Sequence, residues 1–309
     1  MSLNVRPVVP SRIGGAHSSS RAPRSVIGGY IALTKPRIIE LLLITTVPTM
    51  VLAEGSWPSW GLIVVTLIGG SLAAGGANAI NMYIDRDIDA LMERTKNRPL
   101  VTGLITPRNA LVFALSLEVA AFALLWVGAN LLSAVLAVSA TAFYVFVYSL
   151  WLKRTSKQNI VIGGAAGAVP VLVGWAAVTN SLSWSAALLF LLIFLWTPPH
   201  FWALAIRHAD DYRAAGVPML PSVVSTEDVV KSMIRYCVAI LVTSLALVPV
   251  ADLGWIYGVT AALLGVGFLV GTIALGRRPS AGASMRLFSF SITYVSLVFV
   301  ALTIDVLVA

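Results

Sequence analysis

The residues best suited to chemistry lie in a short polar segment that follows a long apolar run. Asn81, Asp85 and Asp89 recur at intervals of four residues, so on a helix their side chains share one face. Carboxylates at this spacing repel each other unless a cation lies between them. Oxygen ligands of this kind suit Mg²⁺, which commonly bridges one or two carboxylates to substrate phosphates. The spacing therefore predicts a magnesium site.

Basic residues beyond these acids suit the phosphate itself. Arg94 and Arg98 are again four residues apart, and guanidinium groups bind phosphate oxygens through forked hydrogen bonds. Lys153 and Arg154 close a later apolar run, where they either anchor a helix at the membrane surface or bind a diphosphate. The alternative for the whole segment is a solvated loop of mixed charge.

A second candidate site surrounds His200. Pro198 and Pro199 precede it, and prolines free carbonyl groups that a membrane helix tolerates only where protein or a wet cavity satisfies them. The pair predicts an interrupted helix with a cavity near His200, although a lone histidine is as readily a hydrogen-bonded packing residue. Asp210 and Asp211 follow and form a second set of candidate metal ligands.

Membrane helices must position these residues. With 58% hydrophobic and 11% charged residues over 309 positions, the composition excludes a soluble globular protein, and a membrane-spanning helix needs about 20 apolar residues. We predict an all-α polytopic membrane protein whose nine transmembrane helices cover 38–53, 60–82, 109–127, 130–151, 160–178, 183–205, 232–250, 254–275 and 287–307. Residues 1–25 are predicted to be a disordered tail, and residues 26–309 a single domain.

The distribution of charge predicts the orientation. With nine spans, all 21 Lys and Arg residues fall on the side that carries the N-terminus and both acidic segments, and the other side has none. Under the positive-inside rule that side is cytoplasmic, and the cell membrane is favoured over the mitochondrial inner membrane. The net charge of +8 is then a topology signal, and no nucleic-acid binding is expected.

Some residues inside or beside the spans have two interpretations. Tyr148 and Trp202 lie toward the cytoplasmic ends of their runs, where aromatic rings either anchor a helix in the bilayer or stabilise a carbocation in a dry pocket. Glu118 falls within a span, where it is either functional or paired with a polar neighbour. Lys35 and Arg37 flank a proline that starts a helix, and we expect them to be interfacial anchors.

The polar segments resemble motifs of the UbiA-type intramembrane prenyltransferases. Residues 81–99 are similar to the first aspartate-rich motif of that family, and the likeness extends to residues 33–37, 159–164 and 174–175. Residues 199–202 and 211–221 resemble the branch that farnesylates protohaem IX. The resemblance implies a nine-helix UbiA-type bundle that transfers a farnesyl group from farnesyl diphosphate to a vinyl group of haem b, with water addition, giving haem O.

The resemblance also implies roles for the candidate residues. A Mg²⁺ cofactor would be held by Asn81, Asp85 and Asp89, with Asp210 and Asp211 opposite. The diphosphate would be bound by Arg94, Arg98, Lys153 and Arg154. The haem or prenyl pocket would include His200, Tyr148 and Trp202, with His200 either an iron ligand or a base that orients water. The implied pathway adds haem A synthase as a downstream partner.

Two other functions stay open. A UbiA-type enzyme that prenylates a quinone, phenol or chlorophyll precursor has the same first motif, but such relatives have an aspartate near the position of His200, where this chain departs. An ion-coupled transporter also carries acids and proline-broken helices, yet its acids are expected near the membrane midplane. Here the two acidic segments lie at one surface beside bases, which favours the enzyme.

Overall fold

The computed structural model describes residues 25–308, without the side chains at 37, 38 and 40–43. Within that range the chain is helical and contains no strand. The predicted disordered tail lies outside the described residues except for Ser25, whose side chain accepts a hydrogen bond from the Gly28 amide and caps α1 (Val26–Thr34). Such a cap satisfies one of the free amides at the helix N-terminus.

Each predicted span matches one long helix or one continuous helical segment, although three of them begin one residue before the helix does. These are α2 (Pro36–Glu54), α3 (Trp60–Ile84), α5 (Pro107–Gly128), α6 (Leu131–Ala142) continued by η1 (Phe143–Leu152) and α7 (Lys153–Thr155), α8 (Asn159–Thr179), α9 (Trp184–Arg207), α12 (Thr226–Val250), α13 (Trp255–Arg277) and α14 (Ala281–Val308). Among the described residues eight of these are long and apolar enough to cross a membrane, and α2 contributes the shorter apolar stretch Ile44–Glu54. The prediction of an all-α membrane bundle is confirmed.

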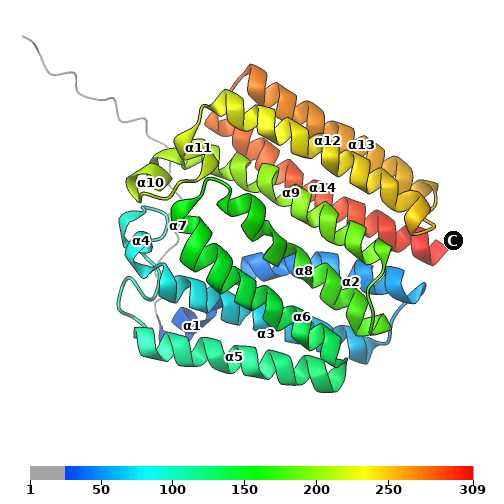
Figure 1. Cartoon of the computed structure of the whole chain (residues 1–309), viewed down its shortest axis with the longest axis horizontal. Helices are drawn as coiled ribbons and strands as arrows, with labels where there is room; N and C mark the ends of the chain where they lie inside the picture. Colours follow the sequence, from blue (N-terminus) through cyan, green and yellow to red (C-terminus); the bar gives the residue numbers. More distant parts are fainter. Residues whose placement is uncertain (1–24, 309) are drawn as a thin grey trace, which may run out of the picture.

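The polar connections gather at one end of the bundle. The short helices α4 (Arg86–Leu91), α10 (Ala209–Ala214) and α11 (Leu220–Val223) lie with α7 at that end, whereas the C-terminus lies at the other (Figure 1). The two acidic segments therefore emerge on the same side, as the parity of the predicted spans requires.

The predicted interruption of α9 is wrong. The helix continues through Pro198 and Pro199 to Arg207, and both prolines are buried. Thr197, one residue earlier, donates its hydroxyl hydrogen to the Ile193 carbonyl at 2.8 Å. Packing on both sides holds the helix together at membrane depth, where neighbouring protein can compensate for missing backbone donors.

A ten-residue π-helical stretch, η1, was not predicted. It continues α6 and carries Tyr144, Tyr148 and Ser149 before the chain reaches Lys153 in α7. The wider turn of a π-helix changes which side chains share a face, and such stretches occur frequently at functional sites. Ser149 and Lys153 contact the acidic cluster described below.

Asp305 joins the last two helices at the end opposite to the acids. Its side chain is 4% exposed and accepts hydrogen bonds from the backbone amides of Gly254 and Tyr257, which cap α13. We expect Asp305→Ala to lower the free energy of unfolding by about 0.5–2 kcal/mol, the range for loss of a helix cap. Thermal unfolding in detergent tests this prediction, and an unchanged melting temperature would contradict it. Substrate affinity should not change.

Candidate active site

The predicted metal ligands meet where α3 passes into α4. Asn81 lies in the last turn of α3, Asp85 joins the two helices, and Asp89 lies in α4; their exposed fractions are 3%, 0% and 3%. Asn81 donates from Nδ2 to Asp85 Oδ2 at 2.7 Å, so the predicted shared face is confirmed for this pair. Buried carboxylates are costly unless they are paired, and the neighbouring bases explain how the protein holds them.

Each buried carboxylate contacts one of the predicted phosphate-binding bases. Lys153 donates from Nζ to Asp85 Oδ2, and Arg98 donates from Nη1 to Asp89 Oδ2 at 2.5 Å. The Lys153 and Arg98 side chains are 14% and 16% exposed. Lys153 is therefore part of the cluster, which decides against a role limited to anchoring its helix.

Lys35 and Ser149 complete the cluster and were missed by the sequence analysis. Lys35 donates from Nζ to Asn81 Oδ1 at 3.0 Å, and Asn81 donates from Nδ2 to Ser149 Oγ at 3.0 Å. We expected Lys35 to be an interfacial anchor, but the structure places it against the metal-ligand face. Burial lowers the pKa of Lys35 well below its usual range, and the nearby Arg98 and Lys153 lower it further. An anion bound here would favour the charged lysine.

The two outer bases, Arg154 and Arg94, differ in whether they form an ion pair. Arg154 forms a forked pair with Asp87 at 2.7 and 2.8 Å, and its Nη2 lies 3.9 Å from Asp85 Oδ1. The hydrogen bond from Arg154 holds the pKa of Asp87 well below its usual range, so this pair stays charged. Arg94 is exposed and forms no ion pair within the described part of the chain.

The second acidic segment touches the first without adding its carboxylates to the cluster. The Asp210 side chain is 98% exposed and pairs with Arg213 at 2.5 Å. Tyr212, next to Asp211, packs on the cluster of Ile88, Met92 and Val217 that joins α4 to the α10–α11 region. Among residues 25–308 no group of three or more His, Cys, Asp or Glu side chains is close enough to hold a metal ion. Metal binding by Asp210 and Asp211 stays a prediction.

The predicted pocket residues do not share one environment. Tyr148 stacks on Tyr144 with 5.2 Å between ring centroids. Trp202 is 2% exposed and meets Tyr236 of α12 edge-on at 5.6 Å. His200 is 6% exposed and lies between aromatic rings of α9 and α14. These rings cover the faces of the imidazole, and the cavity beside His200 stays a prediction.

Known proteins with similar sequences identify the family of this chain. A profile of the UbiA prenyltransferase family matches residues 42–298. The chain belongs to the UbiA prenyltransferase family. A relative named protoheme IX farnesyltransferase from Pseudarthrobacter chlorophenolicus is 51% identical over 304 residues, covering 97% of this chain and 94% of the relative. A relative of the same name from Frankia casuarinae is 54% identical, covering 91% and 98%. The chain is therefore a membrane prenyltransferase.

Solved UbiA structures share the fold. The chain is similar to a structure reported for digeranylgeranylglyceryl phosphate synthase, with a TM-score of 0.76, 16% identity, and coverage of 92% of this chain and 99% of that one. It is also similar to a UbiA homologue from Archaeoglobus fulgidus bound to DMAPP and Mg²⁺, with a TM-score of 0.62, 16% identity, and coverage of 89% and 99%. At these identities the likeness supports the bundle architecture alone.

The donor set of this UbiA prenyltransferase fits a divalent cation. Asp85 Oδ1 is buried and has no hydrogen-bond partner, although Oδ2 of the same carboxylate contacts both Asn81 and Lys153. An uncompensated buried carboxylate oxygen is unfavourable. A hard cation with oxygen ligands would remove that deficit. The amide oxygen of Asn81 and the carboxylate of Asp89 are further buried oxygen donors, which Lys35 and Arg98 contact.

Gly163 of α8 allows Tyr148 to lie where it does. A Cβ atom at position 163 would approach Tyr148 Cδ2 to 2.3 Å, so we expect Gly163→Ala to displace the ring. Overpacking of this kind costs about 1–3 kcal/mol, and we expect lower stability together with lower prenyl transfer. Gly167→Ala is the matched control, because a Cβ atom there meets nothing within 4 Å. Equal activity and stability in the two variants would contradict this role.

Glu118 forms a hydrogen bond within the membrane through one carboxyl oxygen, whereas its Oε2 is buried and has no hydrogen-bond partner among the described residues. Its Oε1 accepts a hydrogen bond from Thr141 Oγ1 at 3.2 Å, and a Cβ atom at Gly76 would come within 2.5 Å of the same oxygen. The carboxyl group thus lies in the close contact between α3, α5 and α6. These contacts support the structural interpretation of Glu118, with the glycine providing the space that small residues provide between membrane helices.

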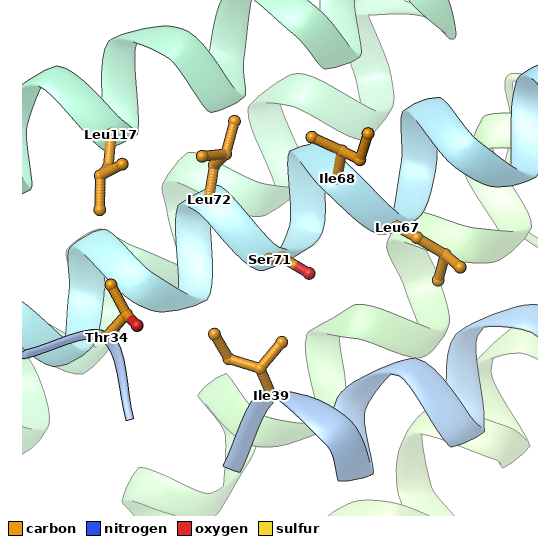
Figure 2. A pocket seen from close by; sticks show the side chains of 7 residues that line it. All are labelled: Thr34, Ile39, Leu67, Ile68, Ser71, Leu72 and Leu117. Atoms are coloured by element: carbon orange, nitrogen blue, oxygen red, sulfur yellow. The ribbon is translucent and has the colours of Figure 1, made fainter. Parts of the chain in front are cut away.

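An apolar groove begins beside the cluster. It has a volume of about 420 Å³, and its wall includes Thr34, the neighbour of Lys35, together with residues of α2, α3 and α5 (Figure 2). The lining residues are Thr34, Ile39, Leu67, Ile68, Ser71, Leu72 and Leu117. None of them is ionisable, so the groove provides space for hydrocarbon and contains no acidic or basic side chain.

Proposed function

We propose that the chain transfers a farnesyl group from farnesyl diphosphate to a vinyl carbon of haem b. The observation that carries the proposal is the identity of 51–54% over most of the chain to relatives named protoheme IX farnesyltransferase. In this reaction the bond between farnesyl C1 and the diphosphate oxygen breaks, and C1 joins the vinyl carbon. Water then adds its hydroxyl to the adjacent carbon and releases a proton. The products are haem O and diphosphate.

The polar cluster is the proposed diphosphate site. Asn81, Asp85 and Asp89 would hold Mg²⁺, and that ion would supply neutralisation of the diphosphate charge. Arg98 and Lys153 now pair with the two acids. Both bases would be available to phosphate oxygens when a cation binds the acids, so the same side chains that now pair with Asp85 and Asp89 would stabilise the leaving group.

The remaining bases extend this site outward. Lys35 contacts Asn81, and Arg94 is exposed and forms no ion pair with another described residue. Arg154 is held by Asp87, so we assign it an outer role in attracting and orienting the diphosphate. Asp211, whose neighbour Tyr212 packs against α4, would approach the diphosphate when substrate binds, and we place Asp210 at the entrance.

The acceptor would lie beside the buried aromatic residues. We assign His200 to contact with the haem, because it is the only histidine of the buried bundle among the described residues. Tyr148, held on Gly163, would line the pocket near the developing carbocation, where ring faces are favourable. Trp202 would support this wall from the α9–α12 contact.

The distribution of basic residues supports an assignment of sidedness. We place the enzyme in the cell membrane with the polar end on the cytoplasmic side, since all Lys and Arg residues lie on that side of the predicted topology. Farnesyl diphosphate would reach the site from the cytoplasm and haem b through the bilayer. An enzyme that consumes haem O, such as a haem A synthase, would be the downstream partner.

Incubation of the purified chain with farnesyl diphosphate, Mg²⁺ and haem b tests the proposal. Mass spectrometry should detect haem O, and omission of Mg²⁺ should abolish it. The control reaction replaces haem with a phenolic or quinone precursor. Product from that acceptor but none from haem would overturn the proposal in favour of the other prenyl transfer. If neither haem b nor a phenolic or quinone precursor yields a product, prenyl transfer to each of these acceptors is overturned.

A further inference from the structure

Ser291 contacts His200 in a way that decides which ring nitrogen carries the proton. Ser291 lies on α14 and is fully buried. Its Oγ atom is 2.6 Å from His200 Nδ1 and 2.6 Å from the carbonyl oxygen of Phe288. A serine hydroxyl has one hydrogen to donate, whereas a carbonyl oxygen only accepts. The two contacts therefore compete for that hydrogen unless the histidine supplies its own.

Only one arrangement satisfies both contacts. When the hydroxyl of Ser291 donates to the Phe288 carbonyl, Nδ1 of His200 must be protonated and donate to Oγ. The reverse arrangement would leave two oxygen lone pairs facing each other at hydrogen-bond distance. Burial favours the neutral ring over the charged one. A neutral imidazole protonated at Nδ1 carries a lone pair on Nε2.

The described neighbours of the His200 ring provide no hydrogen-bond partner for the lone pair on Nε2. The Trp196 ring stacks on the His200 ring with 4.2 Å between the ring centroids, and the Phe288 ring stacks on it at 4.5 Å. Trp196 is itself fixed, because its Nε1 donates to the Ser291 carbonyl at 2.8 Å. Among residues 25–308 no hydrogen bond reaches Nε2 of His200. The imidazole is thus held in place with one unused nitrogen.

We propose that Ser291 is a positioning residue that holds His200 in the Nδ1–H tautomer, so that Nε2 can coordinate the iron of the haem acceptor. The inference rests on the proposed function, which supplies the haem. Metal-binding histidines usually donate their other ring N–H to a neighbouring acceptor, which fixes the tautomer and the ring orientation. The Ser291 hydroxyl is such an acceptor, and its own hydrogen is anchored on a backbone carbonyl.

Titration of the purified full chain with haem b, without farnesyl diphosphate, tests this inference independently of turnover. Haem affinity is measured by absorbance, and the axial ligand by electron paramagnetic resonance of the ferric form. We expect His200→Ala to lose the histidine-ligand signature. We expect Ser291→Ala to weaken haem binding by about 10- to 100-fold, the usual effect of removing the partner of a metal ligand. Ser291→Thr keeps the hydroxyl and should restore the wild-type spectrum.

Ser289→Ala is the matched control, because Ser289 is on the same helix but exposed. It should leave the spectrum and the affinity unchanged. Wild-type affinity and spectrum in Ser291→Ala would overturn the role of Ser291. An unchanged haem spectrum in His200→Ala would overturn iron ligation even if turnover falls, because the histidine would then act only as a base. If the wild-type chain makes haem O in either case, the proposed function stands while this inference fails.

Discussion

Replacement of Asp85 by Asn is expected to lower the rate of prenyl transfer by about 10²- to 10³-fold. Asp85 is fully buried and contributes the carboxylate oxygen that has no hydrogen-bond partner, so its charge is the property that Mg²⁺ would use. Asparagine keeps the shape but removes that charge. Loss of about 3–4 kcal/mol of transition-state stabilisation corresponds to a decrease in kcat of about 10²- to 10³-fold. Steady-state turnover with farnesyl diphosphate and haem b is the measurement.

The matched control for this variant is Glu93→Gln. Glu93 belongs to the same acidic segment, but its side chain is 64% exposed and pairs with Lys96. We expect its turnover to stay within about twofold of wild type, since exposed ion pairs contribute about 0–1 kcal/mol. If Asp85→Asn retained normal turnover, the assignment of the metal site would be wrong, whatever the control shows.

The second large effect concerns the stability of the metal-free protein. Lys153→Met leaves the Asp85 carboxylate buried without its main partner, although Arg154 remains at 3.9 Å. Breaking a buried ion pair by removing one partner costs about 3–5 kcal/mol. The double variant Asp85→Asn with Lys153→Met removes both charges, so we expect it to regain most of that stability and to remain inactive. Unfolding in detergent with and without Mg²⁺ measures the difference.

An exposed pair provides the comparison for this double-variant cycle. Lys231 and Glu227 approach to 2.8 Å, but their side chains are 57% and 77% exposed. Lys231→Met should therefore change stability by less than about 1 kcal/mol. A double variant of Asp85 and Lys153 that is as unstable as Lys153→Met alone would show that burial of an unpaired charge is not the cause.

Periodicity predicted the fold well because it depends on local properties. Runs of apolar residues located each span, and the four-residue spacing of Asn81 and Asp85 gave their direct contact. The beginnings of α12 and α14 were placed too late, at 232 and 287, because the first turn of α12 is polar and that of α14 consists of small residues. Such turns carry no hydrophobic signal.

Contacts between distant segments could not be predicted in the same way. Lys35 lies 46 positions from Asn81, and Ser149 lies 68 positions from it, yet both bond to its side chain. Nothing in the residue types distinguishes these two from an anchoring lysine and a helix serine. The π-helical geometry of η1 has no recognised pattern of residue types behind it, and the aromatic stack on His200 depends on the pairing of α9 with α14.

The most direct test of the account is to locate the metal in the complex with a non-hydrolysable farnesyl diphosphate analogue and Mn²⁺. The anomalous signal of Mn²⁺ in a crystal would identify its ligands. We expect an ion bound to Asp85 and Asp89 and to the diphosphate, with Arg98 and Lys153 moved from the acids to the phosphate oxygens. An ion or a diphosphate bound elsewhere in the bundle, with both acid–base pairs still closed, would contradict the central claim.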